Sequence, residues 1–229
     1  MSDTLSRLRA ANPALNLLPV SALEFARYGR LLTRYDPSEV IAKAKAILPE
    51  AEGVVYEPSV AALEAPTAFT TAIVNEVFGG MPTQVGWCYG RNLRLAGLEY
   101  HKGSEVIVCL TDVVLLVGHV QDIAFGDEIR YDTRQVAAFY APAGAVVEFF
   151  PWNLHFAPIH TTKGGSFATL VYLPKGTNEP LTFSVPKVEE NRLLFAINKW
   201  LLVHPDVEDL VKAGAYPGLA GADIVVTPV

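Results

Sequence analysis

The stretch LEYHKGSEVIV, residues 98–108, brings together three side chains that can bind a metal ion. Glu99 and His101 are two positions apart, so a β-strand would direct both to the same face. Glu105 returns to that face if the strand continues, or through a turn at residues 102–104. An imidazole and two carboxylates suit a divalent cation such as Mn²⁺, Fe²⁺ or Zn²⁺. The spacing therefore predicts a metal site.

The elements that must position these residues are short and rich in β-formers. From Met81 to about residue 175, runs such as TQVGWCYG, EVIVCL, VVLLVGHV, AVVEFFP and FATLVYLP are divided by Gly, Pro, Asp and Asn. This texture predicts a sandwich or barrel of short antiparallel strands. Helical spacing is expected over 2–11, 38–48 and 67–80, and again after Pro186 in EENRLLFAINKWLLVH.

We therefore expect a single domain over 1–229. Its parts are a helical and extended N-terminal flank over 1–80, a barrel core over 81–175 and a helical C-terminal flank over 176–229.

Composition excludes several classes of protein. The 229 residues are 51% hydrophobic, which is ample for a core, and the net charge is -6 without a basic run. General nucleic-acid binding is not expected, because it needs clustered Lys and Arg. No apolar run is long enough to predict a membrane span, and the amino terminus has no apolar signal core, so we expect a cytoplasmic protein. Cys88 and Cys109 form no CxxC pattern.

Two motifs resemble those of the cupin superfamily. EYHKGSE resembles the first cupin motif, His-x-His followed three or four residues later by Glu, with Glu99 in place of the first His. GAVVEFFPWNLH resembles the second motif through Gly144, Pro151 and His155. The resemblance implies a mainly β fold, a jelly-roll-like double-stranded β-helix barrel. It also implies a divalent metal ion held by Glu99, His101, Glu105 and His155, with Mn²⁺ or Zn²⁺ favoured and Fe²⁺ as an alternative.

More closely, GWCYGRN, LEYHKGSE, FYAPAG and LHFAP together resemble a formerly uncharacterised cupin family that includes sulfoquinovose isomerases. This resemblance implies a metal-dependent ketol-isomerase, an intramolecular oxidoreductase that converts sulfoquinovose to sulfofructose. The partner is then a small anionic sugar. Other cupin isomerases act on lyxose, ribose, uronates and hexose phosphates, so the reaction class is broader than one substrate.

The isomerase chemistry needs a base beside the metal ion. An enediol route moves a proton between two adjacent carbons, and a carboxylate at the apolar lip of a barrel can have a raised pKa. Glu148, in AVVEFFP, is the leading candidate, and Glu99 competes if it is not a ligand. Strand parity alone does not show whether Glu148 faces inward. A structural or exposed Glu148 is as well supported as a catalytic one.

Four further residues are candidates for contact with the substrate. Arg91 and Asn92 follow the aromatic strand GWCYG, and a guanidinium can grip an anion, although a solvated or salt-bridged Arg is the commoner case. Trp152 and Asn153 precede His155 at the expected barrel mouth and are placed to touch a sugar. A packing role is the commoner one for such a Trp.

Other functions stay open at this point. They are another metal-dependent isomerase, epimerase or lyase, an iron-dependent oxygenase, or a sugar-binding cupin without catalysis. Two carboxylates in the ligand set favour Lewis-acid chemistry over oxygen activation. Apolar strands such as VVLLVG suggest a homodimer or higher homo-oligomer.

Overall fold

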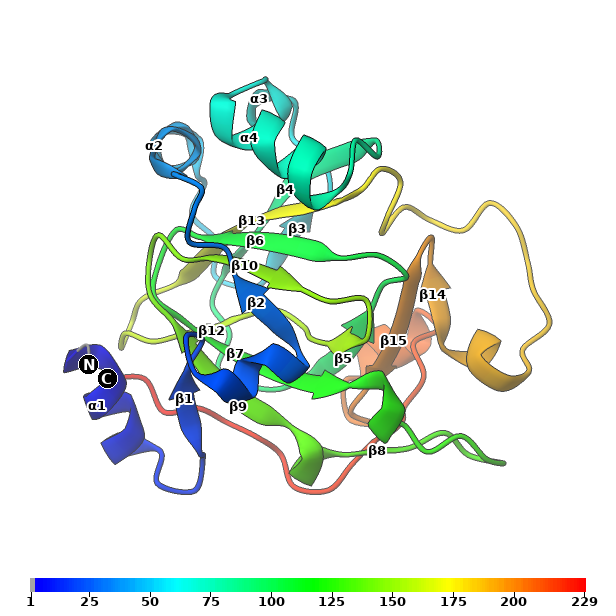
Figure 1. The fold of residues 1–229 in the computed structure, drawn as a ribbon. Coiled ribbons are helices and arrows are strands. Elements are labelled where there is room, and N and C mark those ends of the chain that lie inside the picture. The colour runs from blue at the N-terminus through cyan, green and yellow to red at the C-terminus, as the bar shows by residue number, and fades with distance from the viewer. Residues whose placement is uncertain (1–2) are drawn as a thin grey trace.

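Two β-sheets pack face to face and form a barrel (Figure 1). The computed structural model describes residues 3–229. The six-stranded sheet has the order β2-β10-β6-β13-β4-β3, and the five-stranded sheet has the order β1-β9-β7-β11 with β12 also paired to β7. The strands of the first sheet are β2 (Gly29–Leu31), β3 (Val55–Glu57), β4 (Thr83–Gly90), β6 (Glu105–Cys109), β10 (Val146–Phe149) and β13 (Phe167–Pro174). Those of the second are β1 (Leu17–Pro19), β7 (Val113–His119), β9 (Ala137–Ala141), β11 (Asn153–Leu154) and β12 (Ile159–His160).

The path of the chain between the sheets is that of a jelly roll. The chain crosses from β6 to β7, stays in that sheet for β9, and crosses back to β10. It then crosses again to β11 and β12 and returns to β13, which lies between β6 and β4. Two sheets connected in this way make up the double-sheet jelly roll of cupins. The predicted cupin-type barrel is confirmed.

Strand alternation divides the apolar side chains into layers. Ile107, Leu115, Phe139 and Val171 point between the sheets and fill the barrel interior. The other face of the six-stranded sheet packs under helices, and the other face of the five-stranded sheet packs against α1 and the C-terminal segment. The strands are thus buried on both faces, which explains why their sequences read as continuous apolar runs.

The expected N-terminal helices are present. α1 spans Asp3–Ala11, α2 Ser38–Ile47 and α3 Ala61–Glu64, while the expected helix over 67–80 is α4 (Ala68–Ala72) followed by a π-helical turn, η2 (Ile73–Val77). Ser2, the first residue of the expected helix over 2–11, lies outside the described residues. The side chain of Thr67 accepts a hydrogen bond from the backbone N of Thr70, so it caps α4. Figure 1 shows α2, α3 and α4 above the six-stranded sheet.

The helix expected after Pro186 is wrong. EENRLLFAINKWLLVH forms a 3₁₀ turn, η5 (Glu189–Leu193), and then a hairpin of β14 (Leu194–Ala196) and β15 (Lys199–Val203). β15 pairs with β5 (Gly97–Tyr100), so long-range pairing overrides a run whose apolar spacing also suits a helix. The flanks therefore contribute strands as well as helices: β1, β2 and β3 join the barrel sheets, and α5 (Glu208–Lys212) is a short C-terminal helix.

The remaining elements are short. They are the 3₁₀ turns η1 (Leu23–Arg27), η3 (Val120–Asp122) and η4 (Thr133–Gln135), and the two-stranded pair of β8 (Tyr131–Asp132) with β16 (Leu219–Ala220).

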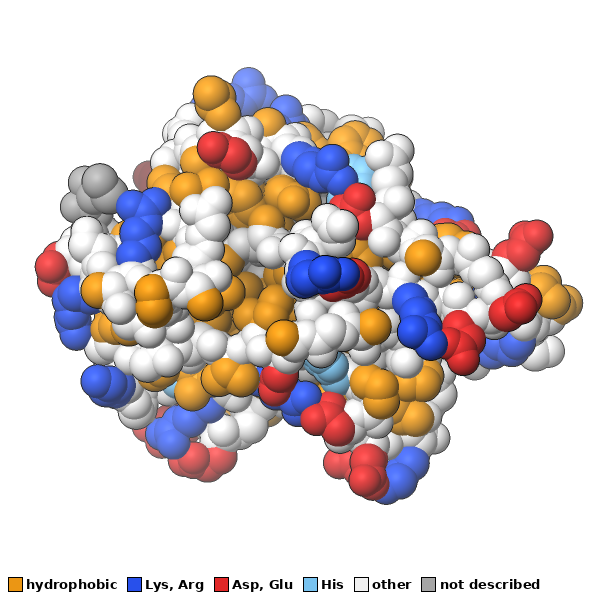
Figure 2. All heavy atoms as spheres, turned by 90° about the horizontal axis from the view of Figure 1, so that it is seen from below, with side chains coloured by type: hydrophobic (Ala, Val, Ile, Leu, Met, Phe, Trp, Pro, Cys, Tyr) orange, Lys and Arg blue, Asp and Glu red, His pale blue; other side chains and the backbone are white. Residues whose placement is uncertain are grey.

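The surface carries charges of both signs. Figure 2 shows Lys and Arg side chains interspersed with Asp and Glu over the face seen from below. Within residues 3–229, no helix combines the length and the apolar character needed to cross a membrane.

Candidate metal centre

Strand β5 directs Glu99 into the barrel, and His101, the residue that follows β5, points the same way. Leu98 and Tyr100, which alternate with them, pack in the core that covers the outside of the five-stranded sheet. Because successive side chains of a strand point to opposite faces, Glu99 and His101 turn the other way. His101 is 2% exposed.

A backbone bridge places His155 directly opposite Glu99. The N–H of Glu99 donates to the carbonyl of His155 at 2.7 Å, and the N–H of His155 donates to the carbonyl of Glu99 at 3.0 Å. Residues paired in this way present their side chains on the same face. The ring of Phe149 stacks on the imidazole of His155, with 4.7 Å between ring centres. Phe149 is the register partner of Glu105, which brings Glu105 to the same place.

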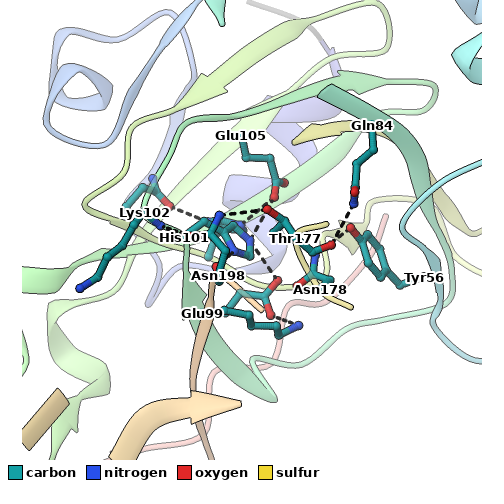
Figure 3. Close-up of polar contacts among 12 residues, drawn as sticks. Tyr56, Gln84, Glu99, His101, Lys102, Glu105, Thr177, Asn178 and Asn198 are labelled. Carbon is teal, nitrogen blue, oxygen red and sulfur yellow. Dashed lines mark hydrogen bonds and ion pairs between the residues drawn. The ribbon is translucent and has the colours of Figure 1, made fainter. Parts of the chain in front are cut away.

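Figure 3 shows Glu99, His101 and Glu105 pointing toward one another, and His155 joins them, so the four predicted ligands converge. The Nε2 atoms of His101 and His155 lie 3.5 and 3.2 Å from Oε2 of Glu105. Oε1 of Glu99 lies 3.9 Å from Nε2 of His101, and Glu99, His101 and His155 offer ligand atoms that are all within 4.8 Å of one another. The two motifs, far apart in the sequence, thus form one buried cluster.

Both imidazoles are fixed with Nε2 toward the cluster. Nδ1 of His101 is 2.8 Å from the carbonyl oxygen of Asn198, and Nδ1 of His155 is 3.2 Å from Oδ1 of Asn153. A carbonyl oxygen only accepts, so with Oδ1 of Asn153 facing His155, each Nδ1 carries the proton and donates it. Each Nε2 of a neutral ring then has a lone pair available for a metal ion. This support of ligating histidines from behind is usual in metalloproteins.

The cluster fits a divalent metal ion. Nε2 of His101 is buried and has no hydrogen-bond partner within the described part of the chain, which is costly for a polar atom unless something binds it. Two ligands that share an ion at about 2.0–2.2 Å lie roughly 3.0–3.6 Å apart, and the distances from Glu105 to the two imidazoles are in this range. Two imidazoles with carboxylates suit Mn²⁺, Fe²⁺ or Zn²⁺ without selecting one.

Burial and charge act in opposite directions on the metal-free cluster. Burial disfavours the ionised form of Glu105, but the adjoining His155 and His101 outweigh it and hold the pKa of Glu105 below its ordinary value. Burial likewise favours neutral His155, but Glu105 outweighs it and raises the pKa of His155 above 6.5. A proton and a metal ion therefore compete for His155.

Glu148 does not join the cluster, and this corrects its expected place at the barrel lip. In β10 it pairs with Val106 and Arg30, and Val106 packs under the helices outside the sheet. Its carboxylate binds the Arg30 guanidinium and accepts a hydrogen bond from the Ser104 hydroxyl. Phe149, the next residue, faces the interior, so parity directs Glu148 outward.

Arg91 and Asn92 lie at the far end of the six-stranded sheet. Gln84, at the other end of β4, pairs with Leu173, and the residue before Leu173, Tyr172, pairs with Val106, the neighbour of Glu105. Arg91 lies seven positions further along, a rise of roughly 20 Å at the usual strand spacing. Its guanidinium pairs with Glu52. The Asn92 amide donates to the carbonyls of Ala157 and Pro158, so it holds a loop.

Trp152 and Asn153 also have other partners. The indole N–H of Trp152 donates to the carbonyl of Arg27, and its ring lines a cavity of about 470 Å³ together with Tyr100, whose side chain points away from the cluster. Asn153 is buried behind His155, where its amide N–H donates to the carbonyl of Tyr28. Its position supports an indirect role, in which it orients His155.

Three residues that the sequence did not indicate belong to the site. Lys199 forms an ion pair with Oε2 of Glu99, and its neighbour Asn198 supports His101. Asn198 has a positive φ of 55°, as expected for the tight turn between β14 and β15. Tyr56 enters from β3, and its hydroxyl accepts a hydrogen bond from the Asn178 amide (Figure 3). Burial and then the charge of Glu105 raise the pKa of Tyr56, so the phenol stays protonated.

The turn in FAINKW is the one local pattern from which a role for Asn198 and Lys199 could have been predicted. Asn in a two-residue loop between apolar runs is typical of a hairpin. The role of Tyr56 has no comparable local signal.

Replacing Asn153 tests the support of His155. Asn153→Ala removes the acceptor for Nδ1, and we expect Co²⁺ affinity to fall about 10–100-fold. Isothermal titration calorimetry of the folded variants measures this loss. The matched control is Asn12→Ala, which removes structural hydrogen bonds between α1 and the C-terminal segment, outside the barrel, and should leave Co²⁺ affinity unchanged. Equal affinities for the two variants would contradict the assigned role of Asn153.

Metal affinity should also fall as the pH falls. Because Glu105 raises the pKa of His155, proton competition begins above pH 6.5 and weakens Co²⁺ binding about tenfold per pH unit below the raised pKa. Titrations between about pH 8 and pH 5 cover this range. In Glu105→Gln the carboxylate charge is gone, so the onset should move to lower pH while affinity at high pH weakens. An affinity that does not depend on pH would show that His155 is not a ligand.

Comparisons with solved structures give weak similarities to β-rich metalloproteins and cupins. An oxidoreductase of the 2OG-Fe(II) oxygenase family from Burkholderia pseudomallei aligns with 63% of this chain and 82% of its own at 13% identity and a TM-score of 0.39. A cupin-like protein from Thermotoga maritima aligns with 62% of this chain and 83% of its own at 14% identity and a TM-score of 0.29. A mutant of Bacillus subtilis oxalate decarboxylase aligns with 55% of this chain at 13% identity and a TM-score of 0.30. This chain spans only 27% of that decarboxylase.

These TM-scores are too low to assign the fold, which rests on the strand order of the barrel. No curated protein sequence matches the chain. One family model does, and it covers residues 17–224, which include both motifs, the barrel and the hairpin that carries Asn198 and Lys199. The chain therefore belongs to the family described as "Domain of unknown function (DUF4867)".

Proposed function

We propose that this protein is a metal-dependent aldose-ketose isomerase whose substrate is an anionic hexose, with sulfoquinovose as the first choice. The observation that carries the proposal is the convergence of two oriented imidazoles with Glu105, while Glu99 lies beside them. A bound divalent ion would hold adjacent hydroxyl and carbonyl oxygens of a sugar and stabilise the charge of an enediolate.

Glu99 is the residue best placed to move the proton. Its side chain is 12% exposed, and it lies at the edge of the cluster, where its Oε2 contacts Nζ of Lys199. A carboxylate in this position can remove a proton from one sugar carbon and return it to the next. Glu148, on the outer face of its sheet, cannot contact a substrate bound at the cluster.

Tyr56 is placed to assist as a hydrogen-bond donor. Its oxygen accepts from Asn178, which leaves the phenolic proton for a sugar oxygen or a carboxylate. Asn198 and Asn153 act indirectly, because they hold the two imidazoles in the required orientation.

The choice of an anionic hexose rests on the resemblance of the sequence motifs. Arg91, expected to grip the anion, is about 20 Å along the sheet from Glu105. Lys199 is a cationic side chain that does contact the cluster, through Glu99.

An iron-dependent oxygenase is the second candidate. His101, Glu105 and His155 make up a set of two histidines and one carboxylate, which is the ligand set of many non-haem iron oxygenases. Such an enzyme has no need of a proton-transfer carboxylate beside the ion, whereas the position of Glu99 favours the isomerase.

The substrate is tested by NMR in D₂O with protein reconstituted with Mn²⁺ or Zn²⁺. Sulfoquinovose, glucose 6-phosphate, glucuronate and lyxose are each incubated with wild type and with His155→Ala, which loses a ligand. We expect one aldose, sulfoquinovose first, to be converted to its ketose by the wild type alone. If no sugar reacts while metal stays bound, a lyase, an epimerase or a sugar-binding module replaces the isomerase.

Two glutamate variants test which carboxylate moves the proton. Glu99→Gln keeps the shape of the side chain without the base, and we expect kcat to fall about 10²–10⁴-fold. The matched control, Glu148→Gln, removes an outer-face carboxylate and should lower stability but leave kcat close to that of the wild type. If kcat falls in Glu148→Gln and not in Glu99→Gln, Glu148 is the base, and the substrate binds on the outer face of the six-stranded sheet.

A further inference from the structure

The ion pair between Lys199 and Glu99 is largely, though not fully, shielded from solvent beside the cluster. The two side chains are 15% and 12% exposed, and Nζ of Lys199 contacts Oε2 of Glu99. The register of β15 with β5 brings the two side chains together. Leu201 is the direct partner of Glu99, and Lys199 lies two positions before Leu201, so its side chain is on the same face of the sheet. Nζ of Lys199 is also 5.8 Å from the ring centre of Phe156.

The two carboxylates of the cluster are not equivalent. Oε2 of Glu105 lies 3.2 and 3.5 Å from the two Nε2 atoms, which is the separation of ligands that share an ion. Oε1 of Glu99 is 3.9 Å from Nε2 of His101, and its other oxygen is turned to Lys199. Glu99 is close enough to reach an ion, because it offers a ligand atom within 4.8 Å of those of His101 and His155, yet it lies farther from Nε2 of His101 than Glu105 does.

We propose that Lys199 is a positioning residue that keeps Glu99 from binding the metal ion. His101, Glu105 and His155 then hold the ion alone, and Glu99 stays free to face the substrate. Moving Glu99 onto the ion would leave the buried ammonium without its carboxylate, which is unfavourable in a low-dielectric site. The inference rests on the proposed metal-dependent function. Of the two roles open to Glu99 in that function, metal ligand or proton-transfer group, it assigns the second.

The lysine also preserves the open positions of the ion. An ion with three protein ligands has room for two oxygens of a sugar, whereas a fourth protein ligand fills one of these positions. Glu99 stands where the motif that EYHKGSE resembles has its first histidine, and here the side chain is paired with Lys199. With this pair intact, Glu99 would serve as a proton-transfer group and not as a fourth ligand.

The test is a double-mutant cycle on Mn²⁺ binding, with Glu99→Gln, Lys199→Met and the double variant in the full-length chain. Affinity is measured by calorimetry, and the number of metal-bound waters is measured by water-proton relaxation. We expect the double variant to bind Mn²⁺ within about twofold of the wild type. Glu99→Gln alone should weaken binding, but less than Glu105→Gln does, because it leaves the ammonium of Lys199 without its carboxylate. Lys199→Met should strengthen binding about tenfold and remove one metal-bound water, and adding Glu99→Gln should reverse both effects.

Two further variants separate charge from packing. Lys199→Arg keeps the cation and should keep the wild-type number of waters. Lys199→Gln repeats the test if Lys199→Met does not fold. Glu105→Gln removes a proposed ligand. Its loss of Mn²⁺ affinity is the reference value for a carboxylate that binds the metal ion.

Each outcome has a defined meaning. If Glu99→Gln weakens Mn²⁺ binding as much as Glu105→Gln does, Glu99 is already a ligand and the inference is wrong. If Lys199→Met and Lys199→Gln leave affinity and bound waters unchanged, Lys199 does not control Glu99, and the inference fails while the metal site stands. If the wild type binds neither Mn²⁺, Zn²⁺ nor Fe²⁺, the proposed function falls and the inference with it.

Discussion

The pair of backbone hydrogen bonds between Glu99 and His155 is the constraint on which the site depends. It holds β5, which otherwise pairs with β15, against the segment that follows β11. In doing so it sets a residue of the first motif and a residue of the second on one face. Without the bridge, both motifs would remain intact in sequence, yet their side chains would not share a centre.

The electrostatics of the cluster follow from this geometry. Glu105 is enclosed by two imidazoles, and Glu99 is shared between an imidazole and an ammonium group. Each buried acid has at least one cationic or potentially cationic neighbour, so neither charge is isolated in the low-dielectric interior. Because Glu105 raises the pKa of His155, a metal ion would compete with a proton for this imidazole.

The sequence predicted the convergence of the four side chains better than it predicted the residues that support them. Glu99 and His101 follow from the period of a strand, Glu105 from a change of direction between β5 and β6, and His155 from motif order. Glu148 was misplaced because a strand of four residues with apolar neighbours on both sides does not reveal which face is inside. The helix expected after Pro186 was wrong because pairing of β15 with β5 is decided by contacts far along the chain. Asn198 supports His101 across a separation of 97 residues, and no local rule reports such a contact.

The site is completed by the hairpin of β14 and β15, which comes after all the barrel strands in the sequence. Its turn supplies both the carbonyl that orients His101 and the ammonium that meets Glu99. The chain must therefore complete the barrel strands and then dock a late C-terminal segment before the centre exists. Contacts of such long range form slowly, because loop closure comes before any gain from packing. A nascent chain that has finished its barrel strands but not its hairpin lacks both of these supports.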